Sequence, residues 1–238
     1  MAEISYVGSE LELFAGVDKW KSYWSRKIRP FMTGDILEVG AGMGVNTPFL
    51  DPGGRGRYVC LEPDPRLVED MQSNLGQAGG RYEIVCGTLQ DLARAPQFDT
   101  IVYIDVLEHI GDDRQELSDA AARLRKNGRL IVLAPAHQQL FSPFDAAIGH
   151  FRRYNRSMLR GISPAGLRLE RMFYLDSAGL ALSAGNRLWM RKSMPTRRQL
   201  HVWDRYVVPL SRVLDLCFCG AVGKTIVAIW RANQESGE

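Results

Sequence analysis

The segment ILEVGAGMGVNTPFL, residues 36–50, decides the fold of this chain. It opens with an apolar run typical of a buried strand, and three glycines two residues apart follow at once: Gly40, Gly42 and Gly44. Because glycine has no side chain, the backbone turns tightly there and can approach a ligand closely. A strand, a glycine loop and a helix in this order favour a nucleoside-binding unit, although glycines also serve plain strand-to-helix turns.

Two acids flank this glycine loop. Glu62 ends the next apolar run, 18 residues beyond Gly44 (62 − 44), close to the spacing of about 20 at which an acid binds ribose hydroxyls. Glu38 stands two residues before Gly40, where we expect its carboxylate to face the ligand. A negative charge there repels the pyrophosphate of a dinucleotide and suits the sulfonium and ammonium groups of S-adenosylmethionine (SAM). The charge pattern therefore favours SAM over NAD.

Short apolar runs alternate with helical stretches beyond the loop. The runs that predict strands are 35–39, 58–61, 82–86, 100–104, 129–133, 167–174 and 225–230, and helical patterns cover 66–75 and 112–124. This alternation is typical of βαβ units around a parallel sheet. We therefore predict an α/β, Rossmann-like fold with a seven-stranded, mostly parallel sheet flanked by helices.

The chain divides into three predicted parts. Residues 1–34 form an N-terminal helical cap, 35–176 with 220–233 form the nucleotide-binding core, and 177–219 form a helical insertion. The insertion has the pattern of two amphipathic helices joined by a basic loop. Its apolar faces would complete the substrate pocket, form a homodimer interface or rest on a membrane surface, in that order of preference.

Composition limits the class of protein further. The 238 residues are 45% hydrophobic and 24% charged with a net charge of +3, which suits one globular domain and makes a nucleic-acid partner unlikely. The sequence shows no signal-peptide pattern, and no apolar segment reaches the roughly 20 residues that span a bilayer. The four cysteines form no C-x-x-C pair. We expect a cytoplasmic protein with reduced cysteines and no transmembrane segment.

Further motifs follow the glycine loop in a fixed order. They are LEPD at 61–64, GTLQDL at 87–92, FDTIVYIDVLEHIGDD at 98–113 and LRKNGRLIVLAP at 124–135. With these motifs, the chain resembles the class I SAM-dependent methyltransferases over about residues 20–175. The resemblance implies SAM as cofactor, S-adenosyl-L-homocysteine as product and an antiparallel last strand.

The resemblance also implies a set of cofactor contacts. The methionine portion of SAM would lie on the glycine loop, the ribose on Glu62, and the adenine beside Thr88 or Leu89 and Asp91. The complete expected set is Tyr23, Glu38, Gly40, Gly42, Asn46, Glu62, Pro63, Thr88, Leu89, Asp91, Asp105, Val106 and His109. Two of these residues have alternatives: Asp91 as the N-cap of a short helix at 92–95, and His109 packed against the fourth strand.

The methyl acceptor is expected near PAHQQLFSPFDAAIGHFRRYNRSML, residues 135–159. This segment resembles bacterial small-molecule methyltransferases in which an aspartate, here Asp145, precedes a G-H-x-R-R-Y string, here 149–154. His150 is the first choice for a general base and His137 the second, and Tyr154 completes the predicted catalytic set. The alternative is a loop brace of Asp145 with the two arginines at 152 and 153, capped by His150.

Other functions remain open. An NAD(P)-dependent oxidoreductase shares the glycine loop, but a catalytic Tyr/Lys or His/Asp pair is not found. Nucleic-acid methyltransferases of exocyclic amines resemble one another in an Asn/Asp-Pro-Pro-aromatic string, whereas this chain has YIDVLEH at 103–109; the basic loop at 187–198 keeps RNA as a weaker alternative. A non-catalytic module that retains the fold is the third alternative. Because acidic metal-ligand clusters are not evident, we expect a metal-free O-methyltransferase of a small molecule, with N-methylation as the alternative.

Overall fold

The computed structural model describes residues 10–76, 80–189 and 196–233, and seven strands form one sheet. The strands are β1 (Ile36–Val39), β2 (Tyr58–Glu62), β3 (Glu83–Cys86), β4 (Phe98–Ile104), β5 (Leu124–Pro135), β6 (Leu167–Leu175) and β7 (Thr225–Ala232). Their order across the sheet is β3-β2-β1-β4-β5-β7-β6, and β7 runs antiparallel to both of its neighbours. The predicted seven-stranded, mostly parallel sheet is therefore confirmed.

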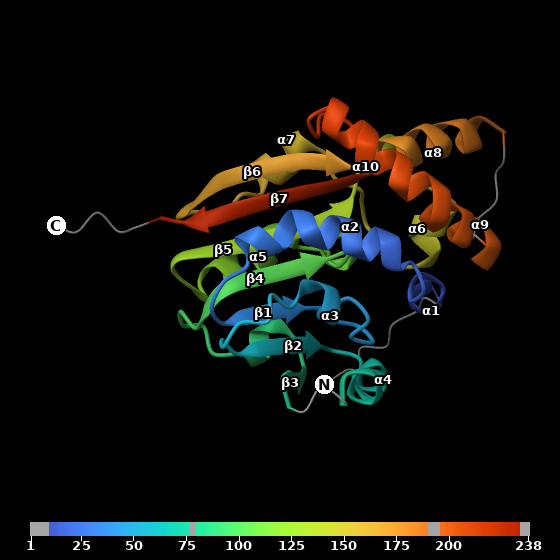
Figure 1. The fold of residues 1–238 in the computed structure, drawn as a ribbon. Coiled ribbons are helices and arrows are strands. Elements are labelled where there is room, and N and C mark those ends of the chain that lie inside the picture. Colours follow the sequence, from blue (N-terminus) through green and yellow to red (C-terminus); the bar gives the residue numbers. More distant parts are fainter. Residues whose placement is uncertain (1–9, 77–79, 190–195, 234–238) are drawn as a thin grey trace.

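Helices cover both faces of this sheet (Figure 1). They are α1 (Glu10–Phe14), α2 (Asp18–Ile28), α3 (Thr47–Leu50), α4 (Pro65–Leu75), α5 (Asp113–Ala121), α6 (Pro143–Ala147), α7 (Arg156–Gly161), α8 (Ser177–Trp189), α9 (Arg197–Val202) and α10 (Val208–Cys217). On one face, Trp24 and Ile28 of α2 pack on strand residues such as Val102. On the other face, Leu117 of α5 and Leu159 of α7 pack on the opposite strand side chains.

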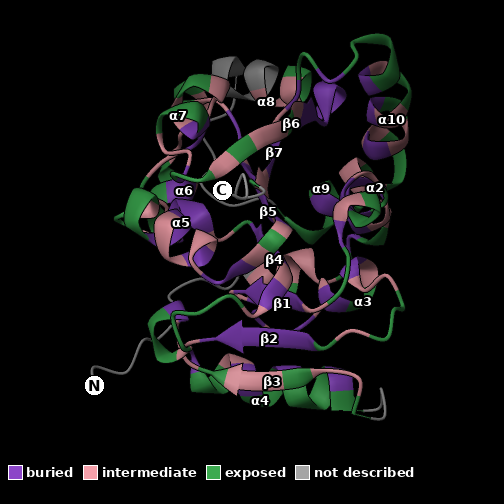
Figure 2. Cartoon of the chain, turned by 90° about the vertical axis from the view of Figure 1, so that its left-hand side faces the viewer, coloured by how far each residue is buried: buried purple, intermediate pink, exposed green. Residues whose placement is uncertain are grey.

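The edge strand β3 is less enclosed than the centre of the sheet. All residues of β1 and β2 are buried, whereas the strand β3 at the edge carries exposed and half-buried residues (Figure 2). A parallel sheet with helices on both faces requires such buried apolar centre strands. Because β1 and β2 are buried on both faces, their sequences are short, continuous apolar runs, and these runs made the two strands predictable.

The boundary between α5 and β5 differs from the prediction. The expected helix over 112–124 ends at Ala121, and β5 starts at Leu124 instead of 129. Leu124 pairs with Phe98 of β4, and a register shift before Thr100 absorbs the additional residues of β5 between Leu124 and Arg129. Leu124 is buried in the core, which extends β5 to this residue, while Asn127 of the Asn-Gly pair keeps a left-handed backbone at φ +63° and bulges out of the strand.

The insertion contains the two helical segments that the sequence predicts. The first is α8; the second consists of α9, a π-helical turn over Trp203–Val207 and α10, which follow one another without a break. Residues 190–195 of the predicted basic loop lie outside the described residues. Asp215 of α10 joins this segment to the N-terminal cap, since its buried carboxylate accepts hydrogen bonds from the Tyr23 hydroxyl and from the backbone N–H groups of Asp176 and Ser177.

A helix that spans a bilayer needs about 20 mostly apolar residues. Across the described ranges, no helix has both the length and the apolar character to cross a bilayer.

Candidate active site

A cavity of about 600 Å³ lies at the edge where the parallel strands end. Loops after β1, β2, β3 and β4 form its floor, and α1, α2 and the π-helical turn form part of its walls. Most of the predicted cofactor contacts line it: Gly40, Gly42, Asn46, Glu62, Pro63, Thr88, Leu89, Asp105, Val106 and His109. Residues far apart in sequence thus meet in one cavity, because parallel strands bring their carboxyl ends to the same edge of the sheet.

The glycine loop needs its glycines for two physical reasons. Gly40 and Gly42 have φ values of +67° and +58°, in the left-handed region that other residues rarely adopt. A Cβ on Gly40 would also lie 2.6 Å from the Val106 side chain. Gly44 also has a left-handed backbone, at φ +72°, and it serves packing as well, because a Cβ there would lie 2.7 Å from Met71 of α4. Only the first two glycines line the cavity.

Glu62 is held rigidly at the end of β2. One carboxylate oxygen accepts a hydrogen bond from the N–H of Gly42 at 2.8 Å, and the other from the N–H of Asp64 at 3.0 Å. Burial raises the pKa of Glu62, and these two backbone bonds favour its charged form. Each oxygen retains a further acceptor position, which suits a ligand that presents hydroxyl donors.

Glu38 does not face the cavity, and that part of the prediction is wrong. One of its carboxylate oxygens accepts hydrogen bonds from the Thr47 and Tyr58 hydroxyls, both at 2.9 Å, and the residue is buried beneath the glycine loop. Desolvation raises its pKa to about 7. The alternation of a strand turns Glu38 to the face covered by α2 and α3, away from the cavity. Its charge therefore does not discriminate between ligands.

Asp91 also lies outside the cavity. The turn Leu89–Asp91 is a short 3-10 helix, and the Asp91 carboxylate accepts bonds from the N–H and hydroxyl of Thr88 in a capping box. These hydrogen bonds hold the pKa of Asp91 below its usual range. Gln90, which the sequence did not single out, lines the cavity and hydrogen-bonds to Glu116.

Tyr23 is the third predicted cofactor contact that turns away. Its hydroxyl donates to Asp215 of α10 at 2.8 Å, and the ring is buried between helices. The residues of α2 that do reach the cavity are Trp20, Lys21 and Trp24. Of the three aromatic residues that the sequence offers as a cover over SAM (Trp20, Tyr23 and Trp24), Trp20 and Trp24 line the cavity and Tyr23 does not.

Two predicted catalytic residues lie outside the cavity. The His137 ring stacks on Tyr174, and its Nε2 hydrogen-bonds to the carbonyl of Gly223 at 2.9 Å. Tyr154 is buried in the core, where its hydroxyl donates to Asp113 at 2.7 Å. Both therefore support the loop after β5 instead of facing a substrate.

His150 lines the cavity, as predicted for the first-choice base. Its Nδ1 lies 3.0 Å from Asp145, whose buried carboxylate also accepts from Arg153 Nε at 2.8 Å and from the Ser142 hydroxyl. These bonds hold the pKa of Asp145 well below its usual range. The alternative of a loop brace is thus also present through Asp145 and Arg153, whereas Arg152 pairs with Asp113 instead.

Several charged residues of the cavity were missed by the sequence reasoning. Glu108 and Lys224 both line it, and burial raises the pKa of Glu108 well above its usual range and lowers that of Lys224. Beside them lies Asp105, which was predicted; its backbone is at φ +52° and desolvation raises its pKa to about 6. The adjacent Glu and His of the LEHI segment were a visible signal for Glu108. Lys224 gave none, because only the antiparallel entry of β7 brings it here.

Few insertion residues reach the cavity. Within its described part only Trp203 lines it, and Trp203 Nε1 donates to Asp176 at 3.1 Å. Among the phenylalanines of the segment 135–159, Phe144 lines the cavity, whereas Phe151 is 61% exposed. The preferred expectation that the apolar faces of the insertion complete the pocket is therefore wrong for α9 and α10.

Comparison with known proteins agrees with this geometry. Residues 37–130 match the family model of a methyltransferase domain. The chain is 25% identical over 185 residues to the ubiquinone biosynthesis O-methyltransferase of Parvibaculum lavamentivorans, covering 71% of this chain and 70% of that one. The enzyme of the same name from Azorhizobium caulinodans is 32% identical over 109 residues, 45% of this chain and 43% of its own length.

Solved structures show the same fold. The N-methyltransferase NodS from Bradyrhizobium japonicum superposes with a TM-score of 0.58 at 12% identity, over 92% of this chain and 97% of that one. The sheet order, the glycine loop and the cavity at the strand ends define a Rossmann-like methyltransferase fold. The methyltransferase-domain match over residues 37–130 and the relatives named as methyltransferases support a SAM-dependent methyltransferase of the class I superfamily, whose methyl donor is SAM.

Proposed function

We propose that the cavity binds SAM along the strand ends and that the enzyme methylates a hydroxyl group of a small, largely apolar acceptor. In this arrangement Gly40 and Gly42 lie against the methionine portion, Glu62 accepts from the ribose hydroxyls, and Thr88 and Leu89 lie beside the adenine. SAM supplies the methyl group when it is bound. The two relatives named as O-methyltransferases support oxygen as the acceptor atom.

The residues present suit such a ligand. The glycine loop offers backbone without side chains at the cavity floor, and Glu62 keeps acceptor positions after its two backbone bonds. The volume of about 600 Å³ falls in the range of small-molecule sites. Room for an acceptor lies between apolar walls: Phe14, Trp20, Trp24, Phe144, Ile148 and Trp203.

One observation carries the proposal for the acceptor: the His150 ring faces the cavity while Asp145 holds its Nδ1 at 3.0 Å. A carboxylate at Nδ1 fixes the proton there, so the lone pair of Nε2 is available to a reacting group. Methyl transfer is a displacement in which alignment and the exclusion of water dominate. His150 acts on the hydroxyl of the acceptor, and the apolar walls exclude water.

The test separates His150 from the cofactor. We expect His150→Ala to lower kcat at least a hundredfold, with catechol-like and phenolic compounds as acceptors, and to change the Kd for S-adenosylhomocysteine less than threefold. His137→Asn is the matched control, because His137 faces away from the cavity. Equal turnover in the wild type and His150→Ala, or methylation of amines alone, would overturn the assignment.

Two acids allow a matched test of the cofactor site: Glu62 lines the cavity, and Asp91 lies outside it. Glu62→Ala should weaken binding of S-adenosylhomocysteine about tenfold or more, because a hydrogen bond to a charged group contributes roughly 1.5–3 kcal/mol. Asp91→Ala, outside the cavity, should leave the Kd unchanged. Isothermal calorimetry measures both. Equal loss of affinity in the two variants would remove Glu62 from the ribose role.

We also propose that α9, the π-helical turn and α10 rest on a membrane surface. Large apolar side chains recur there every three or four residues and are exposed: Val202, Tyr206, Leu210, Val213 and Leu216. The exposed charged side chains of this segment are arginines, at positions 197, 198 and 205, whereas Asp204 and Asp215 make hydrogen bonds within the protein. An apolar stripe beside basic residues is typical of helices at anionic membrane surfaces.

A further inference from the structure

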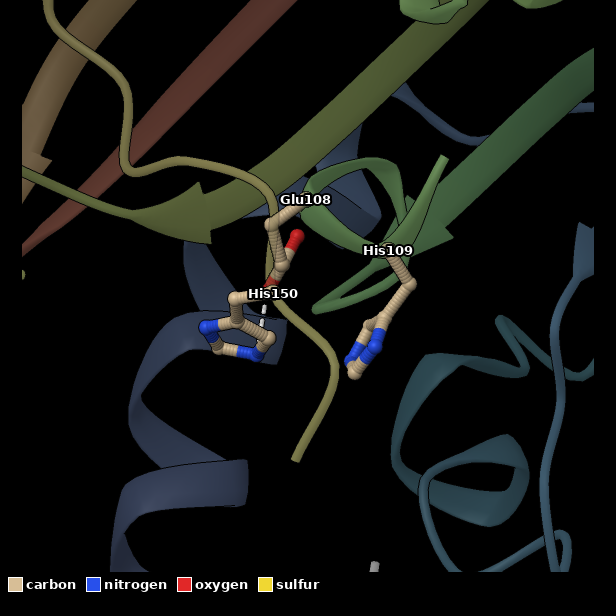
Figure 3. A group of neighbouring side chains, drawn as sticks. All are labelled: Glu108, His109 and His150. Atoms are coloured by element: carbon tan, nitrogen blue, oxygen red, sulfur yellow. Dashed lines mark ion pairs between the residues drawn. The ribbon is translucent and has the colours of Figure 1, made fainter. Parts of the chain in front are cut away.

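Three side chains in the cavity converge on one point (Figure 3). Glu108 and His109 come from the 3-10 turn after β4, and His150 comes from the loop after α6. Each offers one ligand atom, and these atoms all lie within 4.8 Å of one another. The rings of His109 and His150 pack edge to face with their centroids 4.5 Å apart.

Glu108 lacks the partners that a buried carboxylate needs. It is 0% exposed, and neither of its oxygens has a hydrogen bond from another residue in the described part of the chain. The nearest ion-pair contact is His150 Nε2 at 3.9 Å, beyond hydrogen-bond distance. Leaving a buried carboxylate unpaired is costly, so such groups are paired or bind metals. The carboxylate points into the space between the two imidazole rings.

The two histidines are oriented as metal ligands usually are. In metal sites the second ring nitrogen of a histidine donates to a carboxylate or a backbone carbonyl, which fixes the tautomer and directs the other lone pair to the metal. His150 has this arrangement through Asp145, which Arg153 and Ser142 hold in turn. The His109 ring hydrogen-bonds to the backbone of Gly149.

We propose that Glu108, His109 and His150 bind a divalent first-row transition-metal ion in this cavity. Two imidazoles and one carboxylate suit Mn²⁺, Fe²⁺, Co²⁺ or Zn²⁺, whereas Mg²⁺ and Ca²⁺ prefer oxygen ligands alone. Three protein ligands leave further coordination positions for a substrate, as in catalytic metal sites. The carboxylate of Asp105 adds negative charge beside the cluster. The proposal replaces the sequence-based expectation of a metal-free enzyme.

The role of this ion rests on the proposed function, but its binding does not. A hydroxyl coordinated to a divalent cation loses its proton more easily, as metal-bound water does. The proton passes to solvent, the oxygen lone pair forms the bond to the methyl carbon, and the bond from that carbon to sulfur breaks. His150 then acts on the acceptor through the ion, as its ligand, and not as the proton acceptor.

Titration of the chelator-treated full chain with Co²⁺ tests the binding. Calorimetry and the visible absorption of Co²⁺ should show one ion per chain, without SAM or an acceptor. We expect Glu108→Gln, His109→Ala and His150→Ala each to weaken binding at least tenfold. His201→Ala, on an exposed histidine of α9, is the matched control and should bind as the wild type does.

Circular dichroism and thermal melting confirm that each variant is folded, and Glu108→Gln preserves the shape of the side chain. No stoichiometric Co²⁺ binding by the wild type, or equal affinity in folded variants and wild type, overturns the metal site. S-adenosylhomocysteine binding, measured on the same metal-free protein, tests the cofactor proposal separately. Methylation that is lost with chelator and restored by added Mn²⁺ or Co²⁺ supports the catalytic role; full activity without metal overturns that role.

Discussion

At the scale of single residues, Glu38 shows how burial changes a carboxylate. Its oxygen accepts from the Thr47 and Tyr58 hydroxyls under the glycine loop, and desolvation raises its pKa from 4.5 to about 7. The native state therefore binds more protons than the unfolded chain between these two pH values, and stability falls as the pH rises through this window. Burial raises the pKa of Tyr58 and of Cys60, so neither neighbour ionises there.

Glu38→Gln should remove this dependence on pH, because glutamine mimics the protonated acid. The stability of the wild type relative to Glu38→Gln should fall by on the order of 3 kcal/mol between pH 4 and pH 8, at 1.36 kcal/mol per pKa unit. Urea unfolding at both pH values measures it. Glu69→Gln, at an exposed position of α4, gives the baseline. If the wild type and Glu38→Gln lose the same amount of stability between pH 4 and pH 8, the pKa of Glu38 is not raised.

Sequence patterns located these residues in the correct loops and strands but did not give the direction of their side chains. Gly40, Gly42 and Glu62 were predictable because backbone geometry and the end of a strand fix them. Tyr23 and Glu38 were not, because hydrogen-bond partners distant in sequence decide where they point: Asp215 for the first, and Thr47 and Tyr58 for the second. Side-chain direction is a tertiary property.

At the scale of elements, the apolar runs predicted every strand of the sheet. The signal is strongest for the central strands β1 and β2, because buried parallel strands must be apolar on both faces. The faces of the insertion were beyond prediction. An amphipathic helix shows that one side is apolar but not what covers that side. In α10, Val208 and Ser211 face the interior, whereas Leu210 and Val213 are 52% and 59% exposed.

The exposed stripe makes the membrane proposal testable. The double variant Leu210→Glu with Val213→Glu should reduce binding to phosphatidylglycerol vesicles at least tenfold in a flotation assay, because two charges replace the apolar contacts and repel anionic lipid. Gln72→Glu, on exposed α4, is the charge control and should have a much smaller effect. Vesicle binding that is equal in the double variant and the wild type contradicts the proposal. A concentration-dependent dimer that the double variant dissolves, without vesicle binding by the wild type, would assign the stripe to a second copy of the chain.

At the scale of the whole molecule, the cavity joins parts that are distant along the chain. Phe14 and Trp20 come from the N-terminal cap, the glycine loop from the core and Trp203 from the insertion. A ligand that contacts all three parts binds only the folded chain, so it stabilises the molecule as a unit. At 100 times its Kd, such a ligand adds about 2.7 kcal/mol.

S-adenosylhomocysteine should therefore raise the Tm by roughly 5–10 °C at that concentration, since 1 kcal/mol shifts the Tm of a domain of this size by about 2–4 °C. Differential scanning fluorimetry measures the shift. NADH at the same concentration is the control for a dinucleotide and should leave the Tm unchanged, although a glycine loop alone suits either ligand. Glu62→Ala should need about ten times more S-adenosylhomocysteine for an equal shift, because the ribose loses its acceptor. A shift with NADH and none with S-adenosylhomocysteine would show that the cavity is a dinucleotide site.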